Sequence, residues 1–332
     1  MRIRNVKIRN LRAIDDLDLG FAGPDDKPLD LAVLAGPNGC GKTSVLEACL
    51  WALKQDKLVP RKLPDQLYSI ELEVEHDGER VTVVRDTERH HVLYAPDSRP
   101  KQINAFINGT RVFYFSSWRT PKLVGSVGLS VGKGRRPAKT EDNSLWRLKQ
   151  HLVNIKASTA FEGEPVRPNQ SAADLFARIN DAWRMFYPDG HGGFDARKAP
   201  VPRQTNGKEV DDAEVAYDVY FVDEDHLEGI PIDDLSSGEI EVLGMIGTFV
   251  TDASTYDIVV VDEPELHLHP AWHRAILPAL RKVAPKTQFI CATHSGELLD
   301  SVYSFQRFTI LDEDDPRVRL LSPCEEAADA DE

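Results

Sequence analysis

Hydrophobic and polar positions follow two different periods along this chain. Between residues 68 and 94 they alternate, which predicts an antiparallel hairpin with a turn at Asp77 and Gly78. Residues 3–11 predict another strand, edged with basic side chains. Short, mostly apolar runs predict buried strands, and they occur at residues 29–35, 258–261 and 289–292.

Elsewhere apolar residues recur at intervals of three and four, which predicts helices. The first predicted helix covers residues 43–54 and is amphipathic. The other predicted helices cover residues 144–157, 171–187, 238–250, 270–283 and 296–302. Further strands are predicted at residues 112–116, 215–222 and 307–311, and a turn-rich linker at residues 188–207.

In the last third of the chain strands alternate with helices, which predicts a mostly parallel sheet. The expected fold class is therefore α/β, with an antiparallel β subdomain near the N-terminus and a helical lobe inserted in the middle. Of the 332 residues, 41% are hydrophobic and 28% are charged, the balance of a soluble globular protein.

The net charge and the distribution of charged, cysteine and apolar residues make several classes of function improbable. Lys and Arg number 40 against 54 Asp and Glu, for a net charge of −14, which disfavours a wholly basic nucleic-acid coat protein. The tail at residues 312–332 holds nine acidic and two basic residues, as a solvated tail does. The four cysteines show no metal-ligand spacing. Neither a run of 18 apolar residues nor an apolar signal core is present, so we expect a cytoplasmic protein without a membrane partner.

Residues 36–43 match the phosphate-binding pattern G-x-x-x-x-G-K-[ST], known as Walker A, in full. The glycines let backbone N–H groups turn toward phosphate oxygens, and the N-terminus of the following helix adds its positive end. We expect Lys42 to reach the β- and γ-phosphates of ATP and Thr43 to hold Mg²⁺. The predicted nucleotide-binding residues are Gly36, Pro37, Asn38, Gly39, Cys40, Gly41, Lys42, Thr43 and Ser44.

Two carboxylates emerge at the end of the predicted strand at residues 258–261, where ligands bind in open α/β sheets. Asp262 is expected to hold Mg²⁺ together with Thr43, and Glu263 to polarise the attacking water. His294 follows another buried strand, where it would lie beside the γ-phosphate and sense hydrolysis. The predicted catalytic residues are Glu263, His294 and Lys42.

Residues 235–239 read Leu-Ser-Ser-Gly-Glu and open a predicted helix. Ser236 as N-cap with Glu239 three residues later is a capping box, which explains the local sequence by itself. A functional interpretation adds that this helix N-terminus faces a γ-phosphate held by a second subunit.

The order GPNGCGKT, LSSGE, VVVDEPELHLHP and ATHS resembles the ABC-type ATPases. It is similar to the branch of RecF, SMC and OLD (overcoming lysogenization defect) proteins rather than to transporter subunits. Three segments favour that branch, namely IRNLR before the phosphate loop, VLEA after it, and DEPELHLHP around the carboxylates.

The resemblance implies a P-loop ATPase head that works as a homodimer. Each of two ATP molecules would lie between one subunit's phosphate loop and the partner's signature, so Ser236, Ser237, Gly238 and Glu239 join the nucleotide-binding residues. Arg12 is expected to approach the nucleotide, and His267 and His269 to lie at the dimer interface rather than to bind a metal. The expected segments are an N-terminal half of the head at 1–120, an inserted lobe at 121–210, a C-terminal half at 211–311 and the acidic tail.

The sequence also departs from the family pattern. Serine replaces the first of the two glycines in the usual signature, and neither long coiled-coil heptads nor a C-terminal acidic nuclease domain of the Toprim kind is recognisable. A γ-phosphate-sensing glutamine is not clearly placed, with Gln66 and Gln102 as candidates. The family's loop between lobes is expected at residues 115–119.

Residues 119–149 carry eight Lys or Arg and two acidic residues, against the negative charge of the whole chain. Such a segment either binds nucleic-acid phosphates without reading sequence or is a solvated loop. The candidate nucleic-acid contacts are Lys133, Arg135, Arg136 and Lys139. The leading hypothesis is an ATP-dependent switch that acts on DNA with a separately encoded effector, in DNA repair or anti-phage defence. An ATP-gated scaffold that holds a partner inactive is the alternative, and a transporter subunit is third.

Overall fold

A computed structural model gives the structure of the chain at residues 1–88, 92–94, 107–119, 127–128, 144–162, 172–188, 190, 192–199, 216–251 and 256–311. Two compact units, each made of separate segments, divide the chain. The first unit comprises Met1–Tyr114, Asp257–Glu263 and Gln288–Glu332. The second unit comprises Phe115–Tyr256 and Pro264–Thr287.

A mostly parallel sheet forms the centre of the first unit, in the strand order β14-β3-β13-β12-β7. Its strands are β3 (Leu31–Ala35), β7 (Val112–Phe115), β12 (Ile258–Asp262), β13 (Gln288–Thr293) and β14 (Arg307–Thr309). Strand β13 pairs in parallel with both β3 and β12, and all three are buried at every position. The prediction of buried strands in a parallel core is confirmed.

A second sheet in the same unit is antiparallel, in the order β2-β1-β4-β5-β6. Its strands are β1 (Arg2–Leu11), β2 (Ile14–Gly20), β4 (Ser69–His76), β5 (Glu79–Asp86) and β6 (Val92–Tyr94). Asp77 and Gly78 join β4 to β5 with φ values of 48° and 83°. Two consecutive positive φ angles are what a two-residue hairpin turn needs, so the predicted hairpin is confirmed.

Strand β2 was not among the predicted elements. It is an edge strand with three aspartates among seven residues, and its only fully buried position is Ile14. Asp16 and Asp18 form ion pairs with Arg9 and Lys7 of β1. Charge pairs across the two strands thus stabilise β2, and no hydrophobic alternation marks this strand along its full length in the sequence.

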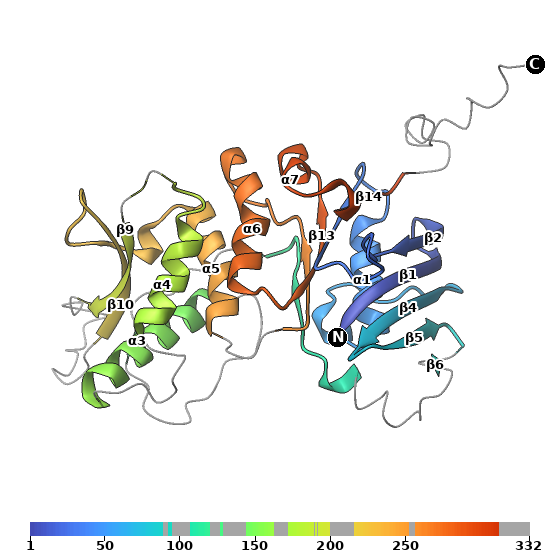
Figure 1. Cartoon of the computed structure of the whole chain (residues 1–332), viewed down its shortest axis with the longest axis horizontal. Coiled ribbons are helices and arrows are strands. Elements are labelled where there is room, and N and C mark those ends of the chain that lie inside the picture. The colour runs from blue at the N-terminus through green and yellow to red at the C-terminus, as the bar shows by residue number, and fades with distance from the viewer. Residues whose placement is uncertain are drawn as a thin grey trace, which may run out of the picture. The chain divides into compact units, whose positions relative to one another are not determined.

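Helix α1 (Lys42–Ala52) lies between the two sheets of the first unit, with contacts to β12 and β13 on one side and to β1, β4 and β5 on the other (Figure 1). Every residue of α1 except Thr43 is buried. The prediction of an amphipathic helix is therefore wrong, because a helix covered on both sides needs no polar face. Burial also raises the pKa of the Cys49 thiol to about 12.

Four helices pack together in the second unit (Figure 1). They are α3 (Ser144–Glu162), α4 (Ala172–Trp183), α5 (Ser237–Thr251) and α6 (His273–Val283). The helix predicted at 270–283 begins with a separate 3-10 turn, η4 (Pro270–Trp272). Other short helices are α7 (Gly296–Asp300), η1 (Asp56–Leu58), η3 (Ile232–Asp234) and η5 (Ser304–Gln306); residues 107–109 form one more helical turn.

A small antiparallel sheet accompanies these helices, with strands β8 (Val127–Gly128), β9 (Gly192–Lys198), β10 (Ala216–Asp223) and β11 (Ile230–Pro231). Strand β9 occupies part of the predicted turn-rich linker, which is wrong for those residues. The glycines at its start favour a turn, and only Phe194 and Ala196 are buried in it. Phe194 packs edge-on against Trp183 of α4 with ring centroids 5.0 Å apart, and this packing holds the strand in place.

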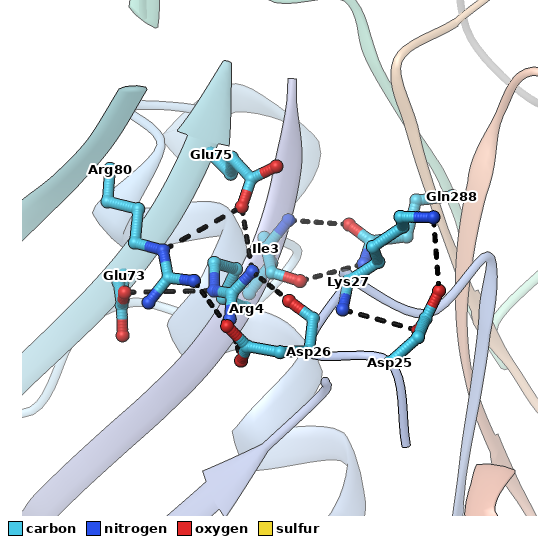
Figure 2. A network of polar contacts seen from close by, with 9 residues as sticks. All are labelled: Ile3, Arg4, Asp25, Asp26, Lys27, Glu73, Glu75, Arg80 and Gln288. Carbon is cyan, nitrogen blue, oxygen red and sulfur yellow. Dashed lines mark hydrogen bonds and ion pairs between the residues drawn. The ribbon is translucent and has the colours of Figure 1, made fainter. Parts of the chain in front are cut away.

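Polar side chains link separate segments of the first unit, and Gln288 links its two sheets (Figure 2). Arg4 of β1 is 5% exposed and forms ion pairs with Asp26, Glu73 and Glu75. Gln288 of β13 is fully buried and reaches the backbone of β1, donating to the Ile3 carbonyl at 2.8 Å and accepting from the Ile3 N–H at 2.6 Å. Gln288 also donates to the Leu29 carbonyl at 2.9 Å, so one side chain joins three segments.

Within the described ranges no helix is long and apolar enough to cross a membrane.

Replacement of Gln288 by leucine removes all three of these bonds and leaves buried backbone groups without partners. We expect Gln288→Leu to lower the free energy of unfolding by about 3 kcal/mol, at the cost typical of orphaned buried groups. Urea unfolding followed by tryptophan fluorescence measures the change. Gln55→Leu, at a half-buried position after α1, is the control and should change stability by less than about 0.5 kcal/mol. Equal urea midpoints for Gln288→Leu and Gln55→Leu would contradict the stabilising role of the Gln288 hydrogen bonds.

Candidate functional site

Residues 36–41 form a loop between β3 and α1 in the first unit, and its glycines meet steric demands that no other residue satisfies. Gly39 and Gly41 have φ values of 86° and 100°, in the left-handed region. A Cβ atom on Gly36 would lie 2.3 Å from the Ile310 carbonyl oxygen. The loop is therefore fixed on its inner side by close packing.

On its outer side the same loop is open. Asn38 and Gly39 are exposed, and a Cβ atom added to Gly39 would meet nothing within 4 Å. Gly41 is the N-cap of α1, and no side chain caps this N-terminus in the described part of the chain. Backbone N–H groups of the first helical turn thus have room to bind an anion, which is the geometry that phosphate oxygens require.

The side chain of Lys42 folds back over this loop. Its Nζ donates to the carbonyl oxygens of Gly36 and Pro37 at 2.9 and 2.8 Å and lies 3.5 Å from Nδ1 of His294. Lys42 is 5% exposed, and among the described residues no carboxylate forms an ion pair with it. A buried ammonium group held only by neutral acceptors is well suited to a phosphate.

Thr43 and Asp262, the two predicted metal ligands, are adjacent. The Thr43 hydroxyl donates to the Asp262 carboxylate, with oxygen–oxygen distances of 3.0 and 3.2 Å. Asp262 is 2% exposed at the end of β12. A hydroxyl and a carboxylate are ligands that Mg²⁺ accepts, with phosphate oxygens and water completing its shell. No group of three or more His, Cys, Asp or Glu capable of holding a metal occurs in the described ranges.

Glu263 and His294 each follow directly after a strand, β12 and β13, and these two strands are neighbours in the parallel sheet. Oε1 of Glu263 lies 3.6 Å from Nε2 of His294, and both side chains are about one-third exposed, at 33% and 37%. Glu263 has a φ of 52°, an uncommon value for a residue other than glycine, while its N–H donates to the Ala292 carbonyl at 2.8 Å. A backbone conformation of this kind persists only where the surrounding structure holds it in place, and it is frequent at functional sites.

Arg12 contacts helix α1 rather than open solvent. Its guanidinium forms an ion pair with the buried Glu47 carboxylate and lies 5.0 Å from the ring centroid of Trp51. Burial raises the pKa of Glu47, and the Arg12 charge opposes that rise. Glu47 was not predicted to matter, although a carboxylate on an otherwise apolar helix was the available signal. A contact between Arg12 and the nucleotide stays a prediction.

The signature segment lies in the second unit, at the start of α5. The Ser236 N–H donates to Glu239 at 2.7 Å and the Glu239 N–H donates to the Ser236 hydroxyl at 3.4 Å, so the predicted capping box is present. Ser236 and Ser237 are exposed, whereas Gly238 is buried. A Cβ atom on Gly238 would lie 2.8 Å from the His267 carbonyl oxygen, so glycine is required here.

The structure thus brings Lys42, Thr43, Asp262, Glu263 and His294 together in the first unit. In the second unit, Arg119 at the end of the predicted loop between lobes forms a buried ion pair with Glu241 of α5, which sequence analysis did not anticipate. Gln66 donates to the Asn10 carbonyl at 3.2 Å. The remaining candidates, Gln102, Lys133, Arg135, Arg136, Lys139 and the acidic tail, lie outside the described residues.

Two family models match the chain. One, described as an AAA domain, matches residues 5–119. The other, described as "AAA domain, putative AbiEii toxin, Type IV TA system", matches residues 133–300, slightly more than half of the chain. The chain belongs to this AAA-domain family. Its sequence and fold are similar to those of ABC-type ATPase heads of the kind found in SMC and OLD proteins, as the sequence motifs predict.

Individual relatives agree with this assignment. A Vibrio cholerae protein named "Retron Vc95 probable ATPase" is 46% identical over 68 residues, which cover 20% of this AAA-domain chain and 13% of that protein. The "OLD nuclease" of Thermus scotoductus is 23% identical over 358 aligned positions, covering 95% of this chain and 63% of the nuclease. This chain therefore spans less than two thirds of either relative.

A solved structure shares the fold of this AAA-domain chain. The SMC head domain from Thermotoga maritima has a TM-score of 0.51 and 16% sequence identity, with 91% of this chain and 92% of that domain covered. The predicted fold class, a P-loop ATPase head with a parallel sheet and antiparallel strands, is confirmed.

Replacement of Lys42 by alanine removes the only predicted phosphate-binding cation of the loop. We expect Lys42→Ala to weaken ATP affinity by about 100-fold, corresponding to roughly 3 kcal/mol from charge-assisted bonds to two phosphates. Isothermal titration calorimetry measures the affinity. Lys54→Ala, two residues beyond the end of α1, removes the same charge and should bind ATP as the wild type does. Retained affinity in Lys42→Ala would refute the assignment of the phosphate loop.

Proposed function

We propose that the chain binds ATP with Mg²⁺ and hydrolyses it to ADP and phosphate, as the two-state element of a homodimeric switch. The observation that carries this proposal is the convergence of three pairs of contacts at one sheet edge. Lys42 lies in the glycine loop, Thr43 bonds to Asp262, and Glu263 lies beside His294. An anion cradle, a divalent-cation pair and a carboxylate–imidazole pair are together what phosphoryl transfer to water needs.

Each group has a defined task in this reaction. The loop N–H groups and Lys42 bind the β- and γ-phosphates, and Thr43 and Asp262 hold Mg²⁺, which neutralises charge on the phosphate oxygens. Glu263 accepts a proton from the water that attacks the γ-phosphorus, while the bond from that phosphorus to the β–γ bridging oxygen breaks. His294 orients Glu263 through the contact at 3.6 Å and bonds to the γ-phosphate.

The exposed helix start at the signature supports the proposed dimer. Ser237 and Gly238 begin a 15-residue helix, and Ser237 is exposed. A helix N-terminus of this kind stabilises an anion brought to it from outside. In the proposed dimer that anion is the γ-phosphate on the partner's phosphate loop, so hydrolysis and subunit association are coupled.

The output of the switch is proposed to be an action on DNA through a separately encoded effector, in defence or repair. Three observations support this step. The matching family is described as a putative toxin of a toxin–antitoxin system, and a relative is named "Retron Vc95 probable ATPase". Residues 119–149 also carry a local excess of positive charge.

Glu263→Gln removes the proton acceptor without changing size. We expect it to bind ATP normally, to hydrolyse it at least about 100-fold more slowly, and to accumulate as an ATP-bound dimer. Phosphate release and light scattering after size-exclusion chromatography measure the two effects. Glu79→Gln, on an exposed position of β5, is the control and should behave as the wild type does. A Glu263→Gln chain that stays monomeric with ATP would count against the dimer.

The proposed action on DNA predicts that nucleic acid raises the rate of ATP hydrolysis. We expect double-stranded DNA, single-stranded DNA or RNA to raise the rate, and the combined change Lys133→Ala, Arg135→Ala and Arg136→Ala to abolish that increase. The combined change Lys27→Ala, Lys57→Ala and Lys286→Ala removes equal charge elsewhere and should leave stimulation intact. Turnover indifferent to all three nucleic acids would favour the ATP-gated scaffold instead.

A further inference from the structure

A tyrosine four residues after the end of α4 contacts the signature of the same unit. The hydroxyl of Tyr187 donates to Oε1 of Glu239 at 2.7 Å. The other oxygen of Glu239 accepts the N–H of Ser236 at 2.7 Å. One carboxylate therefore links Tyr187 to the capping box, and both of its oxygens face a donor.

Aromatic packing fixes the ring of Tyr187. Its centroid lies 5.2 Å from that of Trp272, in an edge-on arrangement, and 5.2 Å from that of Trp183. Trp272 in turn lies beside Gly238, because a Cβ atom there would be 3.5 Å from the Trp272 ring. Burial raises the pKa of the Tyr187 phenol well above its ordinary value, so the hydroxyl stays a donor throughout the physiological range.

The segment before the signature is fixed independently. Lys149 of α3 is fully buried, and its Nζ lies 2.6 Å from Asp233 of η3 and 2.7 Å from Asp218 of β10. Asp233 lies three residues before Ser236. These ion pairs hold the approach to α5, whereas the orientation of the Glu239 side chain is set by its bonds to Tyr187 and Ser236.

That orientation matters because Glu239 carries a negative charge in the first turn of α5. A carboxylate in this position interacts favourably with the free N–H groups and the positive end of the helix. Those N–H groups are the ones that a partner's γ-phosphate would use. A carboxylate free to rotate toward Ser237 and Gly238 would compete with the phosphate and repel it.

We propose that Tyr187 is a positioning residue for the signature, which holds the Glu239 carboxylate on the capping side and leaves the α5 N-terminus free for the partner's ATP. This inference rests on the proposed dimeric ATPase. In this scheme Tyr187 acts through the signature, so it affects association and turnover rather than the first binding of ATP.

The test is Tyr187→Phe in the full chain, compared with Tyr220→Phe, a buried tyrosine of β10 in the same unit. We expect Tyr187→Phe to lower kcat about tenfold and to raise about tenfold the dissociation constant of the ATP-bound dimer, measured in the Glu263→Gln background. Tenfold corresponds to about 1.4 kcal/mol. ATP affinity of the dilute monomer should change less than twofold, and Tyr220→Phe should leave all three quantities unchanged.

Removal of the competing charge separates positioning from general damage. The double change Tyr187→Phe with Glu239→Gln should recover most of the lost dimerisation, because the amide is neutral and no longer repels the phosphate. A Tyr187→Phe chain with wild-type kcat and dimerisation, or a loss that Glu239→Gln does not relieve, would overturn this inference alone. A wild-type chain that neither turns over ATP nor dimerises would overturn the proposed function and this inference with it.

Discussion

Strand β13 pairs in parallel with β3 on one side and with β12 on the other, and this register determines where the candidate functional residues of the first unit lie. Ala35 lies opposite Thr293, and Asp262 lies opposite Ala292, so three strands distant in sequence end at one level. The residues that follow them are the glycine loop, Glu263 and His294. Because the carboxyl ends of parallel strands lie at one edge of the sheet, the functional residues that follow these strands lie close together.

The same register explains why helix α1 is buried on nearly all sides. The helix must begin where β3 ends, so its N-terminus faces the shared edge and its body runs back beneath the sheet. The antiparallel sheet covers its other side, and the buried Gln288 joins the two sheets through hydrogen bonds to the Ile3 backbone, while Arg4 pairs with Glu75 within the antiparallel sheet. Packing of the two sheets thus supports the helix N-terminus at which phosphate is expected to bind.

Sequence could predict the parts of the structure that local patterns determine. The phosphate loop, the buried strands, the Asp77–Gly78 turn and the capping box each follow from a few neighbouring residues. What could not be predicted depends on contacts distant in sequence. Strand β2 is stabilised by pairing Asp16 and Asp18 with β1, strand β9 depends on Trp183, and α1 lacks a polar face because a second sheet covers it. Tyr187 lies 52 residues from Glu239, so no motif could have linked them.

The capping box gives the signature two opposed properties. In the isolated chain, Glu239 satisfies the Ser236 N–H and adds a favourable charge to the helix start, which stabilises α5 without a nucleotide. Under the proposed function, the same charge is unfavourable when the partner's γ-phosphate approaches, so association would have to offset a repulsion that the free chain does not experience. A donor at Oε1, supplied by Tyr187, disperses that charge and fixes its distance from the helix axis. Under the proposed function, stability of the free subunit and closure of the ATP-bound dimer are therefore set by one carboxylate and the hydroxyl that holds it.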